Sequence, residues 1–562
     1  MGYWGFVLIL LAIVTIIFIE GSIREKKQRE EYRKWLRENY GVPNSNPLSH
    51  DDIKNISLYH KRSASGDQHR FYVDDITWND LDMDDIFTRM DTCLSAIGEE
   101  ELYHRLHLPA LSEDDDTIHF KKLREYFETN EEVRVNVQEI LKGIGINRKT
   151  SVTRIFEYVY GLDPESNIQH YMMAGLMLLS IVMIFVIPWI GVLMLIAAAT
   201  ASIGTYLKKK KSIDPVVITF NYTARMLQSC RDLNKLDPEA LDEDISLLNK
   251  YSAPLKNIQG KAVWISTGSV SMDNPAMLTV EYIKMFFHID LIMINRLIKL
   301  LKQHVDEINM IRSILGNIDA SIAAGSYKKS LVHSCIPEFI CENRTVIEIS
   351  EGVHPLISDP VANSISTDRP VLLTGSNASG KSTFLKTVAI SALMAQTLGY
   401  APATAYKASR FKIYTSMALT DSILNGESYF IVEIKSLKRI LDAGDDGMPV
   451  LCCIDEVLRG TNTVERIAAS TQILKSITGD NYIPFAATHD IELTHLLEDQ
   501  YTNYHFEEEV TADDVRFNYK LREGRAQSRN AIRLLQVMDY DPKIIDIADA
   551  MVEAFMNKGT WT

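Results

Sequence analysis

Two long apolar stretches interrupt an otherwise polar chain, and neither contains a charged residue. The first, from Tyr3 to Ile19, is close to the roughly 17 to 25 residues that a helix needs to cross the hydrocarbon core of a membrane. A cleaved signal peptide is the alternative, but no Lys or Arg precedes the stretch, and Glu20-Gly21-Ser22 follows it in place of a small-residue cleavage site. We therefore predict an N-terminal transmembrane anchor.

A basic cluster follows the first apolar stretch and predicts its orientation. Positive residues are retained on the cytoplasmic side of a membrane, so the N-terminus is expected outside and the rest of the chain inside. The residues of this cluster are Arg24, Lys26, Lys27, Arg29, Arg33 and Lys34.

The second apolar stretch runs from Tyr171 to Leu207 and stops at four consecutive lysines, residues 208–211. It is too long for one crossing, and Pro188-Trp189 near its middle favours a break, because proline removes a backbone donor and tryptophan prefers the membrane interface. We predict a hairpin of two short helices with both flanks on the cytoplasmic side. A buried soluble hairpin is the alternative, although these helices lack the polar face of a globular helix. Whether the hairpin crosses fully or re-enters stays open.

The polar remainder of the first 340 residues has the periodicity of helices. A juxtamembrane helix is expected over Glu31–Tyr40, then a linker over Pro43–Pro47, with structure resuming near Phe71. Further helices are expected over Ile86–Leu108, Pro215–Cys230, Pro238–Tyr251 and, as one very long lever with only Gly316 as a breaker, Met277–Ala324.

From Thr345 onward the pattern changes to short apolar runs that alternate with helices. The runs VIEIS, VLLTG, PVLCCID and PFAATH indicate strands of βαβ units, and hence a mainly parallel sheet covered on both faces.

Composition narrows the class of protein. A formal charge of −15 over 562 residues, with a pI near 5.5, argues against a protein that coats nucleic acid over its whole surface. The cysteines lack C-x-x-C spacing, which favours a reducing compartment without a cysteine metal site or a disulfide framework. They are Cys93, Cys230, Cys335, Cys341, Cys452 and Cys453.

A phosphate-binding motif follows the strand that ends at Thr374. It fits G-x-x-x-x-G-K-[ST] at every fixed position, and a helix is expected from Thr383 to Leu398. In such a loop the glycines turn backbone amides toward phosphates, Lys381 reaches the β and γ oxygens, and Ser382 ligates magnesium. The predicted ATP-binding residues here are Gly375, Ser376, Asn377, Ala378, Ser379, Gly380, Lys381, Ser382 and Thr383.

Two further strand ends carry candidate catalytic groups. The strand over residues 449–454 ends in Asp455-Glu456, which we interpret as a carboxylate of the magnesium shell followed by the general base. The strand over residues 483–487 ends in Thr488-His489, where His489 is placed to sense the γ-phosphate. An acidic strand end and a structural histidine are the simpler alternatives.

The segments around these groups resemble the MutS family, best known for DNA mismatch repair. Residues 379–385 (SGKSTFL), 421–434 (DSILNGESYFIVEI), 455–463 (DEVLRGTNT) and 487–489 (ATH) are similar to its G-K-S-T, D-x-x-x-x-G-x-S-x-F-x-V-E-M, D-E-x-x-R-G-T-S-T and A-T-H motifs. Further similarity lies at residues 79–109, at residues 316–319 and at residues 351–355, which include His354 and precede the family's nucleotide pocket.

This resemblance implies a homodimeric, magnesium-dependent ATPase whose Ser428 contacts the γ-phosphate of the partner's site. It also makes DNA a plausible partner. Mismatch-reading domains are expected to be absent, because too little chain precedes Phe71. Where the family stacks an aromatic residue on adenine, this chain has Pro360-Val361-Ala362-Asn363.

The predicted architecture is an α/β P-loop NTPase domain with a mainly parallel, ABC-like sheet, joined to an all-α core and lever domain with transmembrane helices. The expected division is an anchor over 1–22, a juxtamembrane helix and linker over 23–70, a helical core over 71–170, a transmembrane hairpin over 171–207, a core and lever with a shortened clamp over 208–340, and the ATPase and dimerisation domain over 341–562.

Three uses of the ATPase are compatible with this division. One is DNA binding, for which a basic face at Arg296, Lys299 and Lys302, extended by Lys328-Lys329, would be the sign. The second is a membrane-tethered conformational switch that acts on a protein partner without DNA. The third, transport, is disfavoured by the absence of charge inside the apolar stretches.

Overall fold

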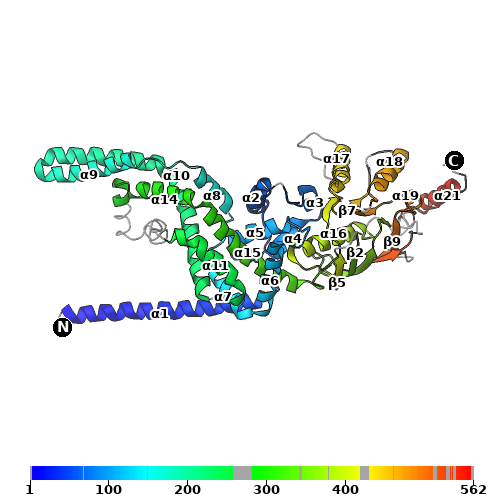
Figure 1. The fold of residues 1–562 in the computed structure, drawn as a ribbon, viewed down its shortest axis with the longest axis horizontal. Helices are drawn as coiled ribbons and strands as arrows, with labels where there is room; N and C mark the ends of the chain where they lie inside the picture. Colours follow the sequence, from blue (N-terminus) through cyan, green and yellow to red (C-terminus); the bar gives the residue numbers. More distant parts are fainter. Residues whose placement is uncertain are drawn as a thin grey trace.

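The chain forms an elongated molecule with helices at one end and an α/β unit at the other (Figure 1). The computed structural model describes residues 3–67, 69–148, 150–236, 238–256, 282–340, 345–376, 379–417, 429–459, 461–479, 481–510, 515–526, 532, 535 and 540–558.

Helices make up the described part of the first 330 residues. In chain order they are α1 (Tyr3–Glu38), α2 (His50–Gly66), α3 (Asp75–Asp80), α4 (Met83–Met90), α5 (Ala96–Leu106), α6 (Asp115–Thr129), α7 (Glu131–Lys142), α8 (Val152–Gly161), α9 (Ile168–Val186), α10 (Pro188–Leu236), the short η1 (Glu239–Leu241), α11 (Asp242–Ser252), the short η2 (Ala253–Leu255), α14 (Ile289–Gln303) and α15 (Val305–Ser330).

The apolar stretches fold as expected, as helices. The second breaks at Ile187 into α9 and α10, so the predicted hairpin is confirmed as a fold. Two segments, Ile168–Val186 and Pro188–Lys209, are long and apolar enough to span a membrane by length and composition. Most side chains of the predicted anchor over 1–22 lie outside the described residues, and that anchor stays a prediction.

Two helix starts differ from the expectation. Structure resumes before Phe71, because α2 starts at His50 with a capping box in which Ser49 and Asp52 each accept from the other's backbone N–H. The predicted Pro215 start is wrong, because α10 runs through the lysine cluster and Pro215 without interruption.

The long lever also differs from its prediction. It is broken at His288 and at His304, whereas Gly316 lies inside α15, where a Cβ would come within 2.8 Å of the Ile97 carbonyl oxygen. The glycine is therefore a close-packing residue between α15 and α5, and residues 277–281 of the predicted lever lie outside the described part.

The α/β unit contains two sheets. Its elements are β1 (Glu338–Phe339), β2 (Ile347–Gly352), β3 (Asn363–Thr367), β4 (Val371–Thr374), α16 (Lys381–Leu398), β5 (Ala405–Ala408), β6 (Lys412–Ser416), α17 (Tyr429–Leu441), the short η5 (Asp442–Gly444), β7 (Val450–Asp455), α18 (Thr463–Ser476), β8 (Tyr482–Ala487), α19 (Ile491–Leu496), β9 (Thr502–Val510), β10 (Val515–Glu523) and α21 (Pro542–Lys558).

The larger sheet confirms the predicted parallel core. Its described strands have the order β10-β9-β4-β8-β7-β6, and each neighbouring pair is parallel except β10 with β9. Strands β4, β7 and β8 are therefore neighbours, and their carboxyl ends meet at one edge. The smaller sheet, β1-β5-β2-β3, carries the segment that precedes the phosphate loop.

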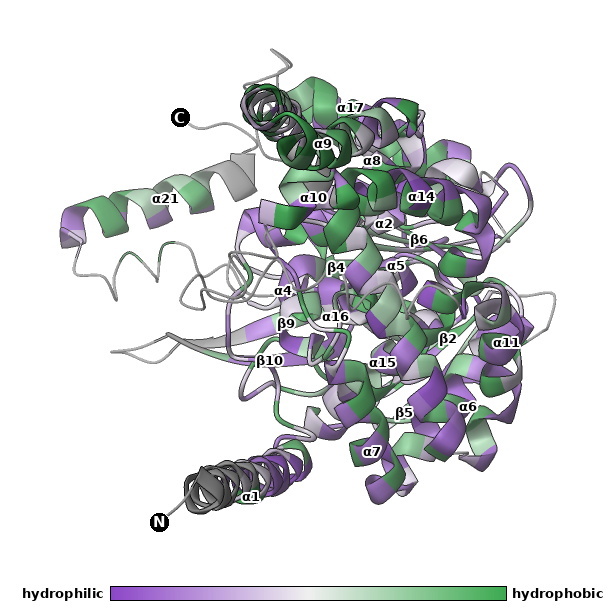
Figure 2. Ribbon diagram, turned by 90° about the vertical axis from the view of Figure 1, so that its left-hand side faces the viewer, coloured by the Kyte–Doolittle hydropathy of each residue, from purple (hydrophilic) through white to green (hydrophobic). Residues whose placement is uncertain are grey.

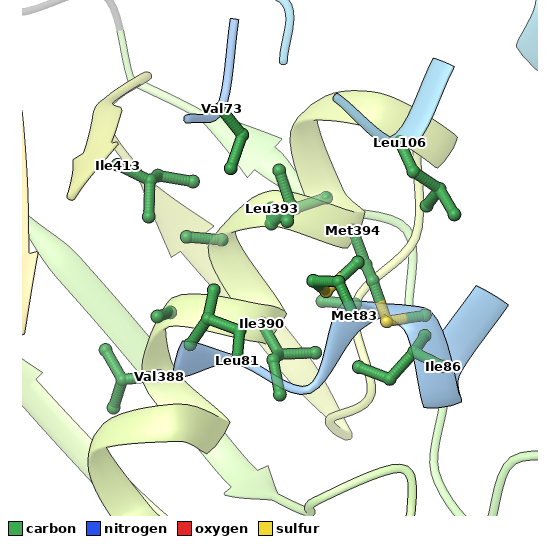
Figure 3. Close-up of a cluster of buried hydrophobic side chains, with 14 of the residues drawn as sticks. Val73, Leu81, Met83, Ile86, Leu106, Val388, Ile390, Leu393, Met394 and Ile413 are labelled. Atoms are coloured by element: carbon green, nitrogen blue, oxygen red, sulfur yellow. The ribbon is translucent and has the colours of Figure 1, made fainter. Parts of the chain in front are cut away.

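The helical part and the α/β unit share one hydrophobic core (Figure 3). Side chains of α4 and α5, such as Ile86 and Leu106, pack against α16 through Ile390 and Met394. Because α16 is the helix that follows the phosphate loop, a displacement of this helix acts directly on the helical part.

Buried acids join α5 to α15 and make stability depend on pH. Burial raises the pKa of the Glu101 carboxyl to about 7, although nearby Arg105 opposes the shift. Between the ordinary pKa and about 7, the folded state binds a proton that the unfolded state does not, so the free energy of unfolding falls as pH rises through 7.

Glu101→Gln should remove this dependence. We expect the variant to gain stability over the natural chain at pH 8, by at most about 3 kcal/mol, and to match it near pH 5. Thermal unfolding midpoints measured in detergent across this range check the prediction, and a parallel loss at both pH values would contradict it.

Candidate nucleotide-binding site

The phosphate loop lies between β4 and α16, at the edge where the parallel strands end. Its glycines adopt conformations that other residues avoid, with φ of 145° at Gly375 and 108° at Gly380. A Cβ on Gly375 would lie 3.0 Å from the backbone carbonyl oxygen of Phe506. The backbone here is thus folded too tightly for any other residue.

A cavity of about 740 Å³ opens above this loop. Of the residues predicted from the sequence, it is lined by His354, Ser379, Gly380, Lys381, Ser382, Thr383, Asp455, Glu456 and His489. Gly375 and Ser376 lie beneath and contact Lys381, while Asn377, Ala378 and Ser428 lie outside the described residues. The cavity volume falls in the range of ligand sites.

Two groups on the cavity floor are suited to phosphate oxygens. Lys381 Nζ donates to the carbonyl oxygens of Gly375 and Ser376 at 2.8 and 2.9 Å, and lies 3.3 Å from His489 Nε2. The hydroxyl of Ser379 is buried and has no hydrogen-bond partner among the described residues. A buried hydroxyl without a partner is costly, and a phosphate oxygen would satisfy it.

Ser382 and Asp455 form the oxygen pair expected for magnesium. The Ser382 hydroxyl donates to the Asp455 carboxylate, which joins the start of α16 to the end of β7. Magnesium binds through one or two protein oxygens together with substrate phosphates, so this donor set fits it.

The Glu456 carboxylate contacts a histidine ring and an arginine guanidinium. Its carboxylate oxygens lie 2.9 Å from His489 Nε2 and 2.7 Å from Arg459 Nε. The His489 hydrogen bond, with the nearby charges, lowers the pKa of Glu456 even though burial opposes the shift. Glu456 also adopts a left-handed backbone with φ of 64°, a strained conformation typical of functional sites.

Glu433 of α17 stabilises this strained loop. It is buried, and its carboxylate accepts from the backbone N–H groups of Leu458, at 2.5 Å, and Arg459. Burial raises the pKa of Glu433. Sequence reasoning had placed Glu433 only within a family motif, without a role.

His354 lies in the cavity wall and is almost fully buried. Its Nδ1 accepts from the backbone N–H of Leu356 at 3.3 Å, and burial with the nearby Lys386 charge lowers its pKa to about 4. The ring is therefore neutral at pH 7.

Sequence reasoning missed the aromatic wall of the cavity, which comes from β10. Tyr519 is 43% exposed, lines the cavity and has φ of 53° at a register shift in the β9–β10 pair. The Asn363 side chain donates to the Tyr519 carbonyl oxygen at 2.9 Å and accepts from Leu521 N–H at 2.8 Å. An aromatic residue about 30 positions beyond a strand-end histidine carries no local signal.

The fold and the cavity define a P-loop nucleotide-binding domain: a parallel sheet, a glycine loop opening a helix, and acidic and histidine side chains on neighbouring strand ends. Residues 371–556 match the family model of MutS domain V. This part of the chain is therefore similar to the fifth domain of MutS proteins.

Two relatives illustrate the extent of the similarity. The chain is 32% identical over 227 residues to the DNA mismatch repair protein MutS of Natronomonas pharaonis, covering 38% of this chain and 26% of the relative. It is 27% identical over 286 residues to human MutS protein homolog 4, covering 47% of this chain and 30% of the relative. The match thus spans less than a third of either relative.

Proposed function

We propose that the chain is a membrane-anchored ATPase that hydrolyses ATP to ADP and phosphate with magnesium. The observation that carries this proposal is the convergence of Ser379, Lys381, Asp455, Glu456 and His489 on one cavity. They come from three strand ends that the sequence separates by about 75 and 35 residues.

Each group has a role in phosphoryl transfer. Ser382 and Asp455 would hold magnesium, which offsets phosphate charge when bound. Lys381 binds the β- and γ-phosphates, and the Ser379 hydroxyl donates to a phosphate oxygen. Glu456, ionised at neutral pH, accepts a proton from the water that attacks the γ-phosphorus, and His489 orients Glu456.

The base of the nucleotide should stack on Tyr519, which leads to a prediction. Base–aromatic stacking contributes about 1 to 3 kcal/mol, so Tyr519→Ala should raise the KM for ATP about tenfold with little change in kcat. Tyr519→Phe is the matched control and should retain the natural KM. An alanine variant with an unchanged KM would show that the base lies elsewhere.

The site is proposed to be completed by a second copy. The resemblance to MutS proteins assigns Ser428 to the partner's γ-phosphate, and helix α21 supports a dimer because Ile544, Ile547 and Met551 on it are exposed. This helix projects from the end of the molecule opposite the hairpin (Figure 1). An exposed apolar helix face at this position fits a second α/β unit.

We propose membrane insertion because the hairpin reverses the usual arrangement of a soluble protein, with apolar side chains outside and polar side chains inside. Its outward residues are large and apolar, with Phe185 85% exposed, whereas its buried positions include small or polar residues such as Ser180 and Ser202. Helices α1 and α9 project from the same end of the molecule, and α9 is apolar around its surface (Figures 1 and 2). One bilayer could hold both, with the ATPase on the cytoplasmic side as the basic flanks predict.

DNA coupling is proposed from the family resemblance, and the conformational switch is the second candidate. The candidate basic face favours the switch, because Arg296 donates to the Tyr171 hydroxyl, Lys302 to the Leu162 carbonyl oxygen and Lys328 to Glu128. These three side chains therefore already bind other groups of the protein, near the hairpin or in the core.

The deciding experiment is the ATPase rate of detergent-purified protein with and without linear, mismatched and branched DNA at several salt concentrations. Stimulation that fades with salt would support phosphate contacts and the DNA function. A measurable rate that no DNA form alters would favour the switch, and no rate at all would reject the proposed ATPase.

A further inference from the structure

A short segment ahead of α14 joins this helix where His288 contacts the foot of the hairpin, the end of α9 and α10 nearest the helical core. Residues 282–286 are helical and lead into α14 through Phe287 and His288. His288 Nδ1 lies 3.0 Å from His170 Nδ1, and His288 Nε2 lies 3.3 Å from the Ser202 carbonyl oxygen. His170 belongs to α9 and Ser202 to α10, so His288 contacts both helices of the hairpin.

The contacts of α14 fix its direction relative to the hairpin. Lys302 reaches Leu162, and Asn295 donates to Asn167 at 2.8 Å. With His288 at His170, these pairs show that α14 runs antiparallel to the chain that enters the hairpin. Moving from Gln303 back toward His288 is thus moving toward the apolar part of the hairpin, and the segment joins α14 where His288 contacts His170 and Ser202.

The surface of this segment has the chemistry of a membrane interface. Tyr282 is 55% and Ile283 45% exposed, and the Tyr282 ring stacks on Phe286. Lys284 is turned inward and is 4% exposed. Tyrosines are enriched where hydrocarbon meets headgroups.

Exposed cations follow where headgroup phosphates would lie. Arg296, which also donates to the Tyr171 hydroxyl, is exposed on α14, and Lys208 is exposed at the end of the apolar part of α10. An aromatic and apolar surface followed by basic residues is the pattern of helices that bind anionic membranes.

We propose that residues 282–287 are seated in the interface of an anionic phospholipid bilayer, beside the foot of the hairpin. This inference rests on the proposed membrane insertion of α9 and α10. It adds a membrane contact at the start of the helix pair α14–α15. The far end of this pair contacts the segment just after α16, where the Tyr400 hydroxyl donates to the Ala324 carbonyl oxygen.

The test is site-directed spin labelling of the full chain in vesicles of phosphatidylcholine and phosphatidylglycerol in equal parts. Labels are placed singly at Ile283→Cys, at Leu178→Cys in the middle of α9 as the hydrocarbon control and at Lys299→Cys as the aqueous control. The unsubstituted protein, treated identically, corrects for labelling of natural cysteines. Relaxation by oxygen, which concentrates in lipid, is compared with relaxation by a water-soluble nickel chelate.

We expect the label at residue 283 to be relaxed more by oxygen than by nickel, as at residue 178, and the label at residue 299 to show the reverse. A label at 283 that behaves like 299 while 178 remains in lipid would overturn this inference and leave the hairpin proposal standing. Protection of 283 from both reagents would also overturn it, because protein would then cover the segment. A label at 178 that nickel relaxes strongly would reject the membrane insertion itself.

Discussion

Glu456→Gln should lower ATP turnover by about 10²- to 10⁴-fold while ATP still binds. A general base contributes rate acceleration of this order, and glutamine keeps the shape of the side chain without accepting a proton. The Glu456 carboxylate contacts His489 and Arg459, and these two side chains position it. Single-turnover hydrolysis and binding of a fluorescent ATP analogue measure the two quantities separately.

Lys381→Ala is the informative comparison for that variant. It removes the cation beneath the phosphates and should weaken ATP binding, whereas Glu456→Gln should not. If glutamine at position 456 sustained normal turnover, the base would have to be another group. If both variants failed to bind, the glutamine would have disturbed the loop that Glu433 holds, and Glu433→Gln would then reproduce the loss.

Arg312→Met should be the most destabilising change in the helical part, by about 3 to 5 kcal/mol. Arg312 is buried in α15 and pairs with the buried Glu100 of α5, which also accepts from the Ser151 hydroxyl at 3.1 Å. Removing the cation leaves the buried Glu100 carboxylate without its partner. Denaturant unfolding of the detergent-solubilised protein gives the change in free energy.

The double variant Arg312→Met with Glu100→Gln is the control for that interpretation. Neutralising the remaining acid should recover a large part of the loss, because an uncompensated charge costs more than a missing pair. Additive losses in the two single variants and their combination would instead indicate that other contacts of the arginine, such as its guanidinium over the Tyr59 ring, are the main contribution.

Much of the site could be predicted because each of its motifs is a short, continuous segment of the sequence. The P-loop pattern, Asp455-Glu456 and His489 each end an apolar run, and parallel strands bring such ends together. The hairpin break at Ile187 was likewise visible in Pro188. The roles assigned to these residues remain predictions until turnover is measured.

The parts that were missed depend on contacts between distant segments. Tyr519 enters the cavity because a bulge in β10 and the Asn363 side chain position it. The break at His288 depends on packing against the hairpin, and helix propensity alone would continue through it. Helix α2 is a different case, because Ser49-x-x-Asp52 is a capping signal that the sequence displays.

Because α10 is one uninterrupted helix, its length determines how far a small rotation at one end moves the other end. A helix of 49 residues is about 70 Å long at the ordinary rise per residue, and it includes both the apolar segment and a wall of the helical core. Each degree by which its core end tilts would carry the opposite end sideways by about 1 Å. Rotations of α10 that are too small to alter the core packing would therefore displace the hairpin tip by distances comparable to the width of a side chain.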